Sequence, residues 1–441
     1  MAKRPQGLNK AAKSKKKQKV DVPIDVDESG ESQQQLTIEV DEEVDPEDEL
    51  GQLNALYKTY LNSPLDANGY RSPKILYGVV HECDRLLRER ARAKDDEGTE
   101  ATSTLPSRFH NIYAHSLLEL ARFAQEQEEE DRDRPIDFIE AALDRVDTGL
   151  EQYPNDAQLL FTRAKALAAR VAEMMLPENL PGSDFEERFQ GVVDTIEDVN
   201  KAIKNYETAE TLVLQSENSA PGSSYTQDQL DTVAELLRIG EQYGSLDLIR
   251  INSGDDSISD ELSGQQPRLA SWARARYEQV LDNIQAGKGK ARTPQEDGDH
   301  SHEVLRRAHR GMGEYYLSMA GPITSQIEQL VEDDDDDEDE DDDEDNEQDT
   351  ERSPETEKLY SEAKELLKLA IDHLLKAQHD NEKDGPIVYP LIAEAQISLA
   401  NLLENESEEQ KVLYDEAVQV LKRAQRLGFG DFREQIAELE Q

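Results

Sequence analysis

The sequence predicts an all-α protein with charged, unfolded segments at its N-terminus and in its C-terminal third. Three observations predict this class. Apolar residues recur every three or four positions through most of the 441-residue chain, which is the spacing of an amphipathic helix. No long run alternates apolar and polar residues as a half-buried strand does. The 98 acidic residues outnumber the 49 basic ones, and the resulting net charge of −49 is unevenly placed along the chain.

Composition excludes several classes of protein. No apolar run approaches the roughly 18 residues that a membrane-spanning helix needs, and the basic N-terminus lacks the apolar core of a secretory signal. The single cysteine, Cys83, excludes an internal disulfide and a cysteine-rich zinc module, so the expected compartment is reducing. Because so acidic a chain repels phosphate backbones, direct nucleic-acid binding is not expected.

Residues 1–46 are predicted to be a disordered tail, basic at first and acidic afterwards. Residues 1–19 carry basic residues and no acid, and they show no apolar periodicity that could offset the entropy of ordering. Their basic run is a candidate nuclear-localisation segment, and a solubilising or RNA-touching tail is the alternative. The residues of this candidate are Lys13, Lys15, Lys16, Lys17 and Lys19.

An apolar alternation interrupts the acidic half of this tail. Leu36, Ile38 and Val40 occupy every second position, as they would in a strand. The segment is too short to be stable alone. We interpret it as a linker or as a short docking element.

Residues 47–180 are predicted to form the N-terminal helical repeats. Pro135 is compatible with the first turn of a helix that closes at Tyr153-Pro154, because the residue before a proline disfavours helical geometry. Asn155 or Asp156 can cap the next helix, which is expected to end before Pro177.

Residues 181–290 are predicted to be a middle helical segment with loops near 219–228 and 251–266. The capping-box pattern Ser183-x-x-Glu186 precedes an apolar spacing that continues to Tyr206 and predicts one helix. Thr226-x-x-Gln229 opens a second helix. A third helix contains Trp272.

Residues 300–441 are predicted to be C-terminal helical repeats, interrupted by an acidic insert at 331–352. A helix through Met312 is expected to stop at Gly321-Pro322, because proline cannot donate the helical hydrogen bond. Residues 332–345 are consecutive acids. Like charges repel one another along a helix, so we expect the insert to be solvated and disordered.

A recurring spacing suggests how the helices pack. Small and large apolar residues repeat at intervals of three, four and three, and small residues let one helix approach its neighbour closely. The pattern favours an irregular tetratricopeptide-like solenoid of antiparallel helix pairs. Any amphipathic helix also produces three/four spacing, which is the alternative. The sets are Tyr360, Ala363, Leu367 and Ala370; Tyr414, Ala417, Leu421 and Ala424; and Ile139, Ala142, Val146 and Gly149.

Known catalytic patterns do not occur, so we predict a protein that is not an enzyme, with no catalytic, cofactor-binding or metal-binding residues and no cofactor. Phosphate-binding glycine loops, HExxH and GxSxG are absent. His300-Ser301-His302 lies in a predicted loop, and we interpret it as a solvated pair. In His81-Glu82-Cys83 the helical period places the thiol on an apolar face, which indicates a core cysteine.

Several segments together resemble the fungal enhancer of translation termination family. The resemblance begins with Met1-Ala2-Lys3-Arg4-Pro5 and continues with Asp48-Glu49-Leu50-Gly51-Gln52-Leu53. It includes Val80-His81-Glu82-Cys83-Asp84-Arg85-Leu86-Leu87-Arg88 and, near the C-terminus, Asn401-Leu402-Leu403-Glu404-Asn405-Glu406-Ser407. The matches occur in order from the first residue to about residue 410.

This resemblance implies a non-catalytic, nuclear helical-repeat protein. It implies an adaptor that is required for correct translation termination and takes part in oxygen-dependent (hypoxic) gene regulation. The implied partners are a prolyl-hydroxylase-type dioxygenase or termination factors, with a nuclear import receptor for the basic tail. Iron and 2-oxoglutarate would belong to the dioxygenase partner. We expect neither membrane nor nucleic-acid partners.

Two questions stay open at this level. Trp272, Tyr315 and Tyr316 are candidate aromatic anchors for a partner, but they could equally belong to the core. An acidic chaperone for histones or ribosomal proteins, acting through residues 332–345, is the alternative function.

Overall fold

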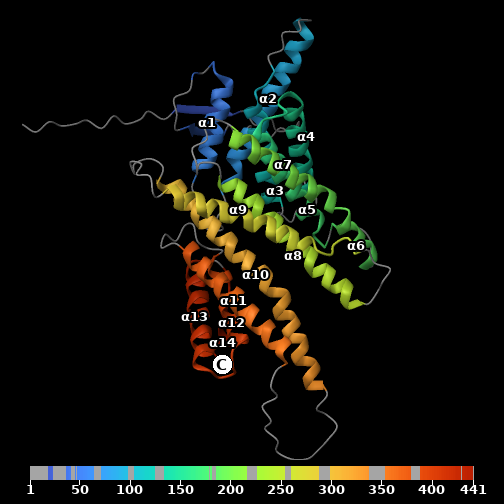
Figure 1. Cartoon of the computed structure of the whole chain (residues 1–441). Helices are drawn as coiled ribbons and strands as arrows, with labels where there is room; N and C mark the ends of the chain where they lie inside the picture. The colour runs from blue at the N-terminus through green and yellow to red at the C-terminus, as the bar shows by residue number, and fades with distance from the viewer. Residues whose placement is uncertain are drawn as a thin grey trace, which may run out of the picture. The chain divides into compact units, whose positions relative to one another are not determined.

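The computed structural model contains helices and one short two-stranded sheet within the residues it describes (Figure 1). These residues are 18–22, 36–40, 45, 47–63, 71–97, 104–124, 134–177, 179–180, 185–215, 226–253, 260–287, 298–336, 353–378, 388–428 and 430–440. None of the helices in these ranges combines the length and hydropathy of a membrane span.

The chain divides into two compact units, with the boundary between Gln152 and Tyr153. The domain boundaries proposed from the sequence at 180 and 290 stay predictions. The first unit holds β1 (Gln18–Val22), β2 (Leu36–Val40), α1 (Glu49–Asn62), α2 (Pro73–Glu97), α3 (Ser107–Ala124) and α4 (Pro135–Gln152).

The second unit contains the remaining helices. They are α5 (Ala157–Met174), α6 (Phe185–Val193), α7 (Ile196–Gln215), α8 (Gln227–Ser253), α9 (Gln265–Gly287), α10 (Gly298–Asp336), α11 (Pro354–Ala377), α12 (Val388–Asn401), α13 (Glu408–Arg426) and α14 (Arg433–Leu439).

The predicted all-α, repeat-like class is confirmed, and the helix ends show why the local sequence works. Asp156 caps α5 by accepting a hydrogen bond from the backbone N–H of Leu159 at 3.0 Å. At the start of α8, Gln229 accepts from the Thr226 backbone N–H at 2.8 Å, and the Thr226 hydroxyl accepts from the Gln229 backbone N–H at 3.4 Å. This pair is the predicted capping box. Ser183 lies outside the described residues.

The recurring small-residue spacing faces neighbouring helices. Ala363, Leu367 and Ala370 of α11 are fully buried, and so are the equivalent residues of α13. The first of them shares a core with Ala320 and Ile327 of α10. Alanine therefore stands where two helix backbones approach each other, as the sequence pattern predicts.

Close approach without a side chain joins α9, α10 and α11. A Cβ atom on Gly311 of α10 would lie 2.1 Å from Cζ of Tyr277, which is 1% exposed in α9. A Cβ on Gly313 would lie 2.5 Å from Cγ of Leu374 in α11. Glycine on two sides of one helix turn thus lets α10 pack between its neighbours, and Figure 1 shows α10 and α11 side by side.

Helix α10 corrects two predictions, because it continues through Pro322 and ends at Asp336. Pro322 cannot donate to the carbonyl of Ser318, but the Gln266 side chain of α9 donates to that oxygen at 3.2 Å. Gly244 of α8 leaves the space for Gln266, since a Cβ there would lie 1.9 Å from its amide oxygen. Once a helix is established, adding further residues to it is favourable, so α10 extends into the first acids of the predicted insert, up to Asp336. Residues 337–352 lie outside the described ranges.

The helix predicted from Phe185 to Tyr206 is two helices, because the chain turns at Asp194 and Thr195. The Thr195 hydroxyl contacts the Val192 carbonyl at 2.6 Å and the Tyr243 hydroxyl of α8 at 2.7 Å. Thr195 is fully buried. A local side-chain bond to the backbone competes with helix continuation, and Tyr243 fixes the turn from another helix.

Two further elements differ from the predictions. The alternating segment Leu36–Val40 is strand β2, and it pairs antiparallel with β1 inside the tail that was expected to be disordered. Each strand provides the hydrogen-bonding partner that the other lacks alone. The rest of residues 1–44 lies outside the described ranges. His300, which was predicted to be in a loop, lies in the first turn of α10.

Candidate partner-binding surface

Trp272, a candidate anchor for a partner, is held inside the second unit. Its indole N–H donates to Glu207 of α7 at 3.1 Å, and its ring packs edge-on against Tyr206 with centroids 5.2 Å apart. The guanidinium of Arg276 lies 4.1 Å from the centre of the indole ring and pairs with Glu207 and Glu210 at 3.2 and 3.0 Å. We call these five residues the α7–α9 network. Trp272 therefore joins helices within the fold.

The two candidate tyrosines have different environments. Tyr315 is buried, and the Arg274 guanidinium lies 5.6 Å from its ring centre. Tyr316 is half-buried, and its ring lies 5.7 Å from that of His373. Nδ1 of His373 lies 3.1 Å from Nδ1 of His309, and burial lowers the pKa of His373. Both tyrosines thus take part in intramolecular contacts.

An acid on α8 lies in a strongly perturbed environment. Burial, helped by the nearby Glu314 and Glu394 carboxylates, raises the pKa of Glu241 to about 7, although a hydrogen bond from Ser318 and the charge of Arg238 both lower it. These acids come from α8, α10 and α12. This group titrates near neutral pH because the surrounding helices remove water without supplying a full counter-charge.

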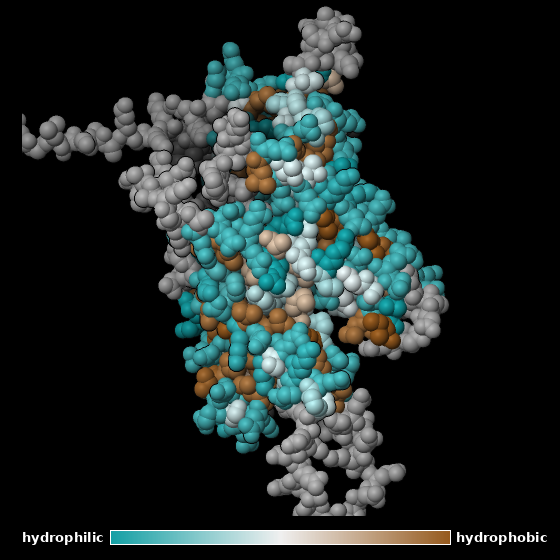
Figure 2. Space-filling model, in the orientation of Figure 1, coloured by the Kyte–Doolittle hydropathy of each residue, from teal (hydrophilic) through white to brown (hydrophobic). Residues whose placement is uncertain are grey.

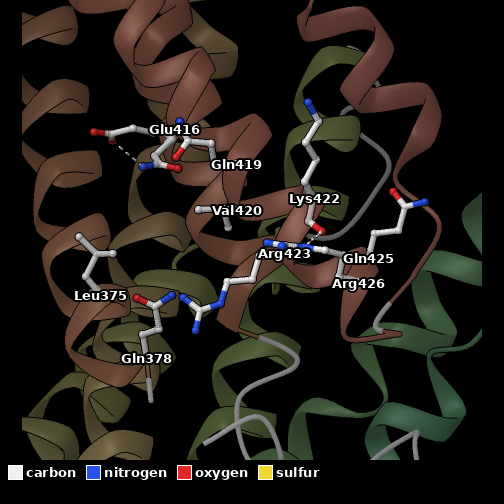
Figure 3. A pocket seen from close by; sticks show the side chains of 10 residues that line it. Leu375, Gln378, Glu416, Gln419, Val420, Lys422, Arg423, Gln425 and Arg426 are labelled. Atoms are coloured by element: carbon white, nitrogen blue, oxygen red, sulfur yellow. Dashed lines mark hydrogen bonds between the residues drawn. The ribbon is translucent and has the colours of Figure 1, made fainter. Parts of the chain in front are cut away.

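The second unit contains an open pocket of about 1020 Å³ between α11, α12 and α13 (Figure 3). Its basic residues are Lys422, Arg423 and Arg426, and Glu416 is its acid. In Figure 3 the Arg423 side chain extends toward α11. The remaining lining residues are Leu375, Gln378, Gln396, Gln419, Val420 and Gln425. We call this site the C-terminal pocket.

Two positions in the C-terminal pocket have unused binding capacity. Gln396 is 3% exposed and donates through Nε2 to Glu416 at 2.9 Å, but its Oε1 has no hydrogen-bond partner. A carboxylate only accepts, so this contact fixes the amide orientation and leaves Oε1 as a free acceptor. The guanidinium of Arg423 lies 5.1 Å from the ring centre of Tyr389, and no carboxylate among the described residues pairs with it.

Exposed hydrophobic side chains occur on the wall of this pocket and elsewhere on two of its helices. Leu375, on its wall, is 47% exposed, and Leu369 and Val412 on the same helices are 42% and 52% exposed. Figure 2 shows hydrophobic patches among hydrophilic side chains over the C-terminal helices. A ligand of this surface would meet both cations and apolar groups.

The structure also gives the positions of some other residues that the sequence analysis named. Cys83 is fully buried in α2, as predicted, and burial raises the pKa of its thiol. Lys19 lies in β1 opposite Glu39. The other candidate nuclear-localisation residues, Lys13, Lys15, Lys16 and Lys17, lie outside the described residues.

Sequence reasoning missed the C-terminal pocket, although one signal was present. Glu416, Gln419, Arg423 and Arg426 follow one another at intervals of three, four and three, which places a polar stripe beside the buried stripe of α13. What the spacing could not indicate is that Gln396 of α12 faces this stripe.

The architecture defines a helical-repeat protein, and the C-terminal pocket gives it an exposed, charged concavity. The chain belongs to the family described as nuclear pore complex subunit Nro1, whose family model matches residues 1–440. The family resemblance inferred from the sequence is thereby confirmed.

Curated relatives cover the chain from end to end. It is similar to Enhancer of translation termination 1 of Yarrowia lipolytica, with 35% identity over 472 aligned positions and 100% of both chains covered. The protein of that name from Candida albicans (strain SC5314) is 33% identical, again over 100% of both chains. A solved structure of the S. pombe nuclear import adaptor Nro1 shares 20% identity, with a TM-score of 0.46, covering 89% of this chain and 98% of that one.

Proposed function

We propose that this chain is a non-catalytic adaptor that binds partner proteins on its helical repeats and acts in the nucleus. The observation that carries the proposal is the match, over residues 1–440, to a family described as a nuclear pore complex subunit. Stacked helix pairs offer an extended surface suited to protein partners. The C-terminal pocket supports the same function, because it offers unpaired donors and an unpaired acceptor.

The proposal extends to the process that the adaptor serves. Full-length relatives are named Enhancer of translation termination 1, which supports a role in translation termination. From the family resemblance we also propose a role in oxygen-dependent gene regulation. The proposed partners are a prolyl-hydroxylase-type dioxygenase or termination factors, together with an import receptor.

Crosslinking mass spectrometry on the native complex tests the adaptor function. We expect lysines of the second unit to crosslink to a small set of proteins that includes a dioxygenase of this class or a termination factor. Recovery of the complex should fall as salt rises, because charged contacts are screened. The absence of any stable partner at low ionic strength would contradict the proposal. Crosslinks to histones or ribosomal proteins that vanish when residues 337–345 are deleted would favour the chaperone function instead.

Nuclear entry through the basic run is tested separately. Replacing Lys15, Lys16 and Lys17 with alanine should shift a fluorescent fusion toward the cytoplasm, since an import receptor reads clustered positive charge. Replacing Lys201 and Lys204 of α7 with alanine is the matched control. Unchanged nuclear accumulation in the triple variant would contradict this part of the proposal.

A further inference from the structure

We propose that the C-terminal pocket binds an acidic segment of a partner protein, with its carboxylates on Arg423 and Arg426. The inference rests on the proposed adaptor function and adds to it a surface and a chemical class of ligand. Four observations support it: the positive charge of the pocket, the unpartnered oxygen of Gln396, the exposed apolar side chain on the pocket wall, and the limited length of the chain's own acidic tract.

The charge of the pocket is opposite to that of the chain. Its walls carry three cations and one acid in a protein whose net charge is −49. Lys422 is paired with Glu440, whereas neither Arg423 nor Arg426 forms an ion pair with a described residue. Both arginines lie in the last turn of α13, where positive charge complements the helix dipole. The interaction with the dipole does not use up the N–H groups of a guanidinium. These donors point outward in the plane of the group, and two of them match a carboxylate in a bidentate pair.

The free acceptor adds specificity for a peptide backbone. Oε1 of Gln396 is buried without a partner, and a buried acceptor left unsatisfied costs about 1–3 kcal/mol. A backbone N–H of a bound segment would donate to it once the side chains that cover the amide move aside. The Glu416 contact holds the amide in the required orientation at 2.9 Å.

The apolar wall indicates that acids alone are not the whole ligand. Leu375 is 47% exposed beside the pocket, and Val420 lies across from it on α13. The volume of about 1020 Å³ is at the top of the roughly 300–1,000 Å³ range of small-molecule sites. A short segment that mixes acidic and apolar side chains fits this combination.

The protein's own acidic tract is too short to be the occupant. Helices α10 and α11 are antiparallel, since Gly313 meets Leu374 while Ile327 meets Tyr360. At 1.5 Å per residue, Leu375 lies roughly 32 Å along α11 from its start, so a path there and back needs about 64 Å. The roughly 17 peptide links between Asp336 and Ser353 span about 60 Å at full extension. The length of this tract therefore excludes it, and the positive charge of the pocket assigns the occupant to an acidic segment of a partner.

Fluorescence anisotropy on the full chain tests the inference. The probe is a short fluorescein-labelled peptide of glutamates and leucines, and its twin carries glutamine in place of each glutamate. We expect the acidic peptide to bind and the twin to bind at least tenfold more weakly. The double variant Arg423→Gln, Arg426→Gln should lose tenfold or more in affinity, and Gln396→Met should lose several-fold. Lys201→Gln with Lys204→Gln, which removes the same charge from α7, should bind as the unmodified chain does.

Three results would overturn the inference. One is equal binding of the two peptides, and another is equal loss in the arginine pair and the α7 control. The third is a tenfold gain in affinity after deletion of residues 337–345, or after Asp380, Glu382 and Asp384 are neutralised, because the chain's own acids would then occupy the pocket. Thermal melts of each variant separate lost binding from lost folding.

Crosslinking of the arginine-pair variant separates this inference from the adaptor function. If the peptide fails to bind but partner crosslinks persist elsewhere on the repeats, the pocket assignment is wrong and the adaptor function stands. If both fail in the unmodified chain, both proposals are wrong.

Discussion

The α7–α9 network and the C-terminal pocket both place an arginine over an aromatic ring, but only one of them satisfies that arginine. Arg276 lies 4.1 Å from the ring centre of Trp272 and pairs with two glutamates. Arg423 lies 5.1 Å from the ring centre of Tyr389 and has no carboxylate partner among the described residues. Cation–aromatic contact alone therefore does not separate a structural arginine from one that is available to a ligand. The presence or absence of a carboxylate paired with the guanidinium separates them.

The largest expected difference between the two regions is in stability. Arg276→Gln should lower the free energy of unfolding by about 2–3 kcal/mol, because it leaves Glu207 and Glu210 facing each other without a shared counter-charge. Arg423→Gln, its matched control, should cost at most about 0.5 kcal/mol, the scale of a helix-dipole contact. Urea denaturation measures both free energies of unfolding, and equal losses would show that the two arginines are equally important to the fold.

A second test concerns packing along α10, which is close at Gly311 and open at Gly321. Gly311→Ala should destabilise by about 2 kcal/mol, since the clash with the enclosed Tyr277 ring exceeds the roughly 1 kcal/mol gain in helix propensity. Gly321→Ala on the same helix meets no atom within 4 Å beyond its chain neighbours. Its propensity gain is offset by the proline that follows, so its effect should be near zero. Urea denaturation should place the two alanine variants about 2 kcal/mol apart, and similar unfolding midpoints for both would contradict the proposed interlock.

Glu241 is intermediate between Arg276, whose charge is fully paired, and Arg423, whose charge has no carboxylate partner in the described part of the chain. The charge of its carboxylate is only partly balanced by Arg238. Its pKa is raised to about 7, so the folded state binds a proton that the unfolded chain releases near pH 4.5. The stability from this proton is complete below about pH 4.5 and is lost as pH rises through about 7. Glu241→Gln should therefore match the unmodified chain closely at pH 4.5 and exceed its free energy of unfolding by about 2–3 kcal/mol at pH 8. Exposed Glu362→Gln controls for net charge, and thermal melts across this range would show no difference between the two variants if Glu241 titrates normally.

The smallest expected effect concerns the proline that α10 contains. Gln266→Met should cost about 1 kcal/mol because the Ser318 carbonyl loses its donor. In a Pro322→Ala background the new backbone N–H serves that carbonyl, so the same change should cost much less. A double-mutant cycle measures this coupling. Additive effects would show that the side chain does not replace the missing helical bond.

Local sequence was sufficient wherever a residue acts on its own helix. The capping roles of Asp156 and of Thr226 with Gln229 follow from positions three residues away, and the structure contains both. The small-residue faces of α11 and α13 are likewise determined by helical periodicity, and they are buried. The all-α class follows for the same reason, because periodicity is written in neighbouring residues.

Tertiary structure decided what depends on partners far along the chain. Helix α10 continues through Pro322 because the Gln266 side chain donates to the Ser318 carbonyl, which the proline cannot serve. Helix α6 ends before Thr195, whose hydroxyl contacts the Tyr243 hydroxyl of α8. The sequence also could not show that Arg423 has no carboxylate partner within the residues that the structure describes. Arginines of several helices lie over aromatic rings, and only the fold shows which of them also meet a carboxylate. Whether a donor is satisfied depends on which distant groups the fold brings within about 3 Å, and that distance is not a property of any local pattern.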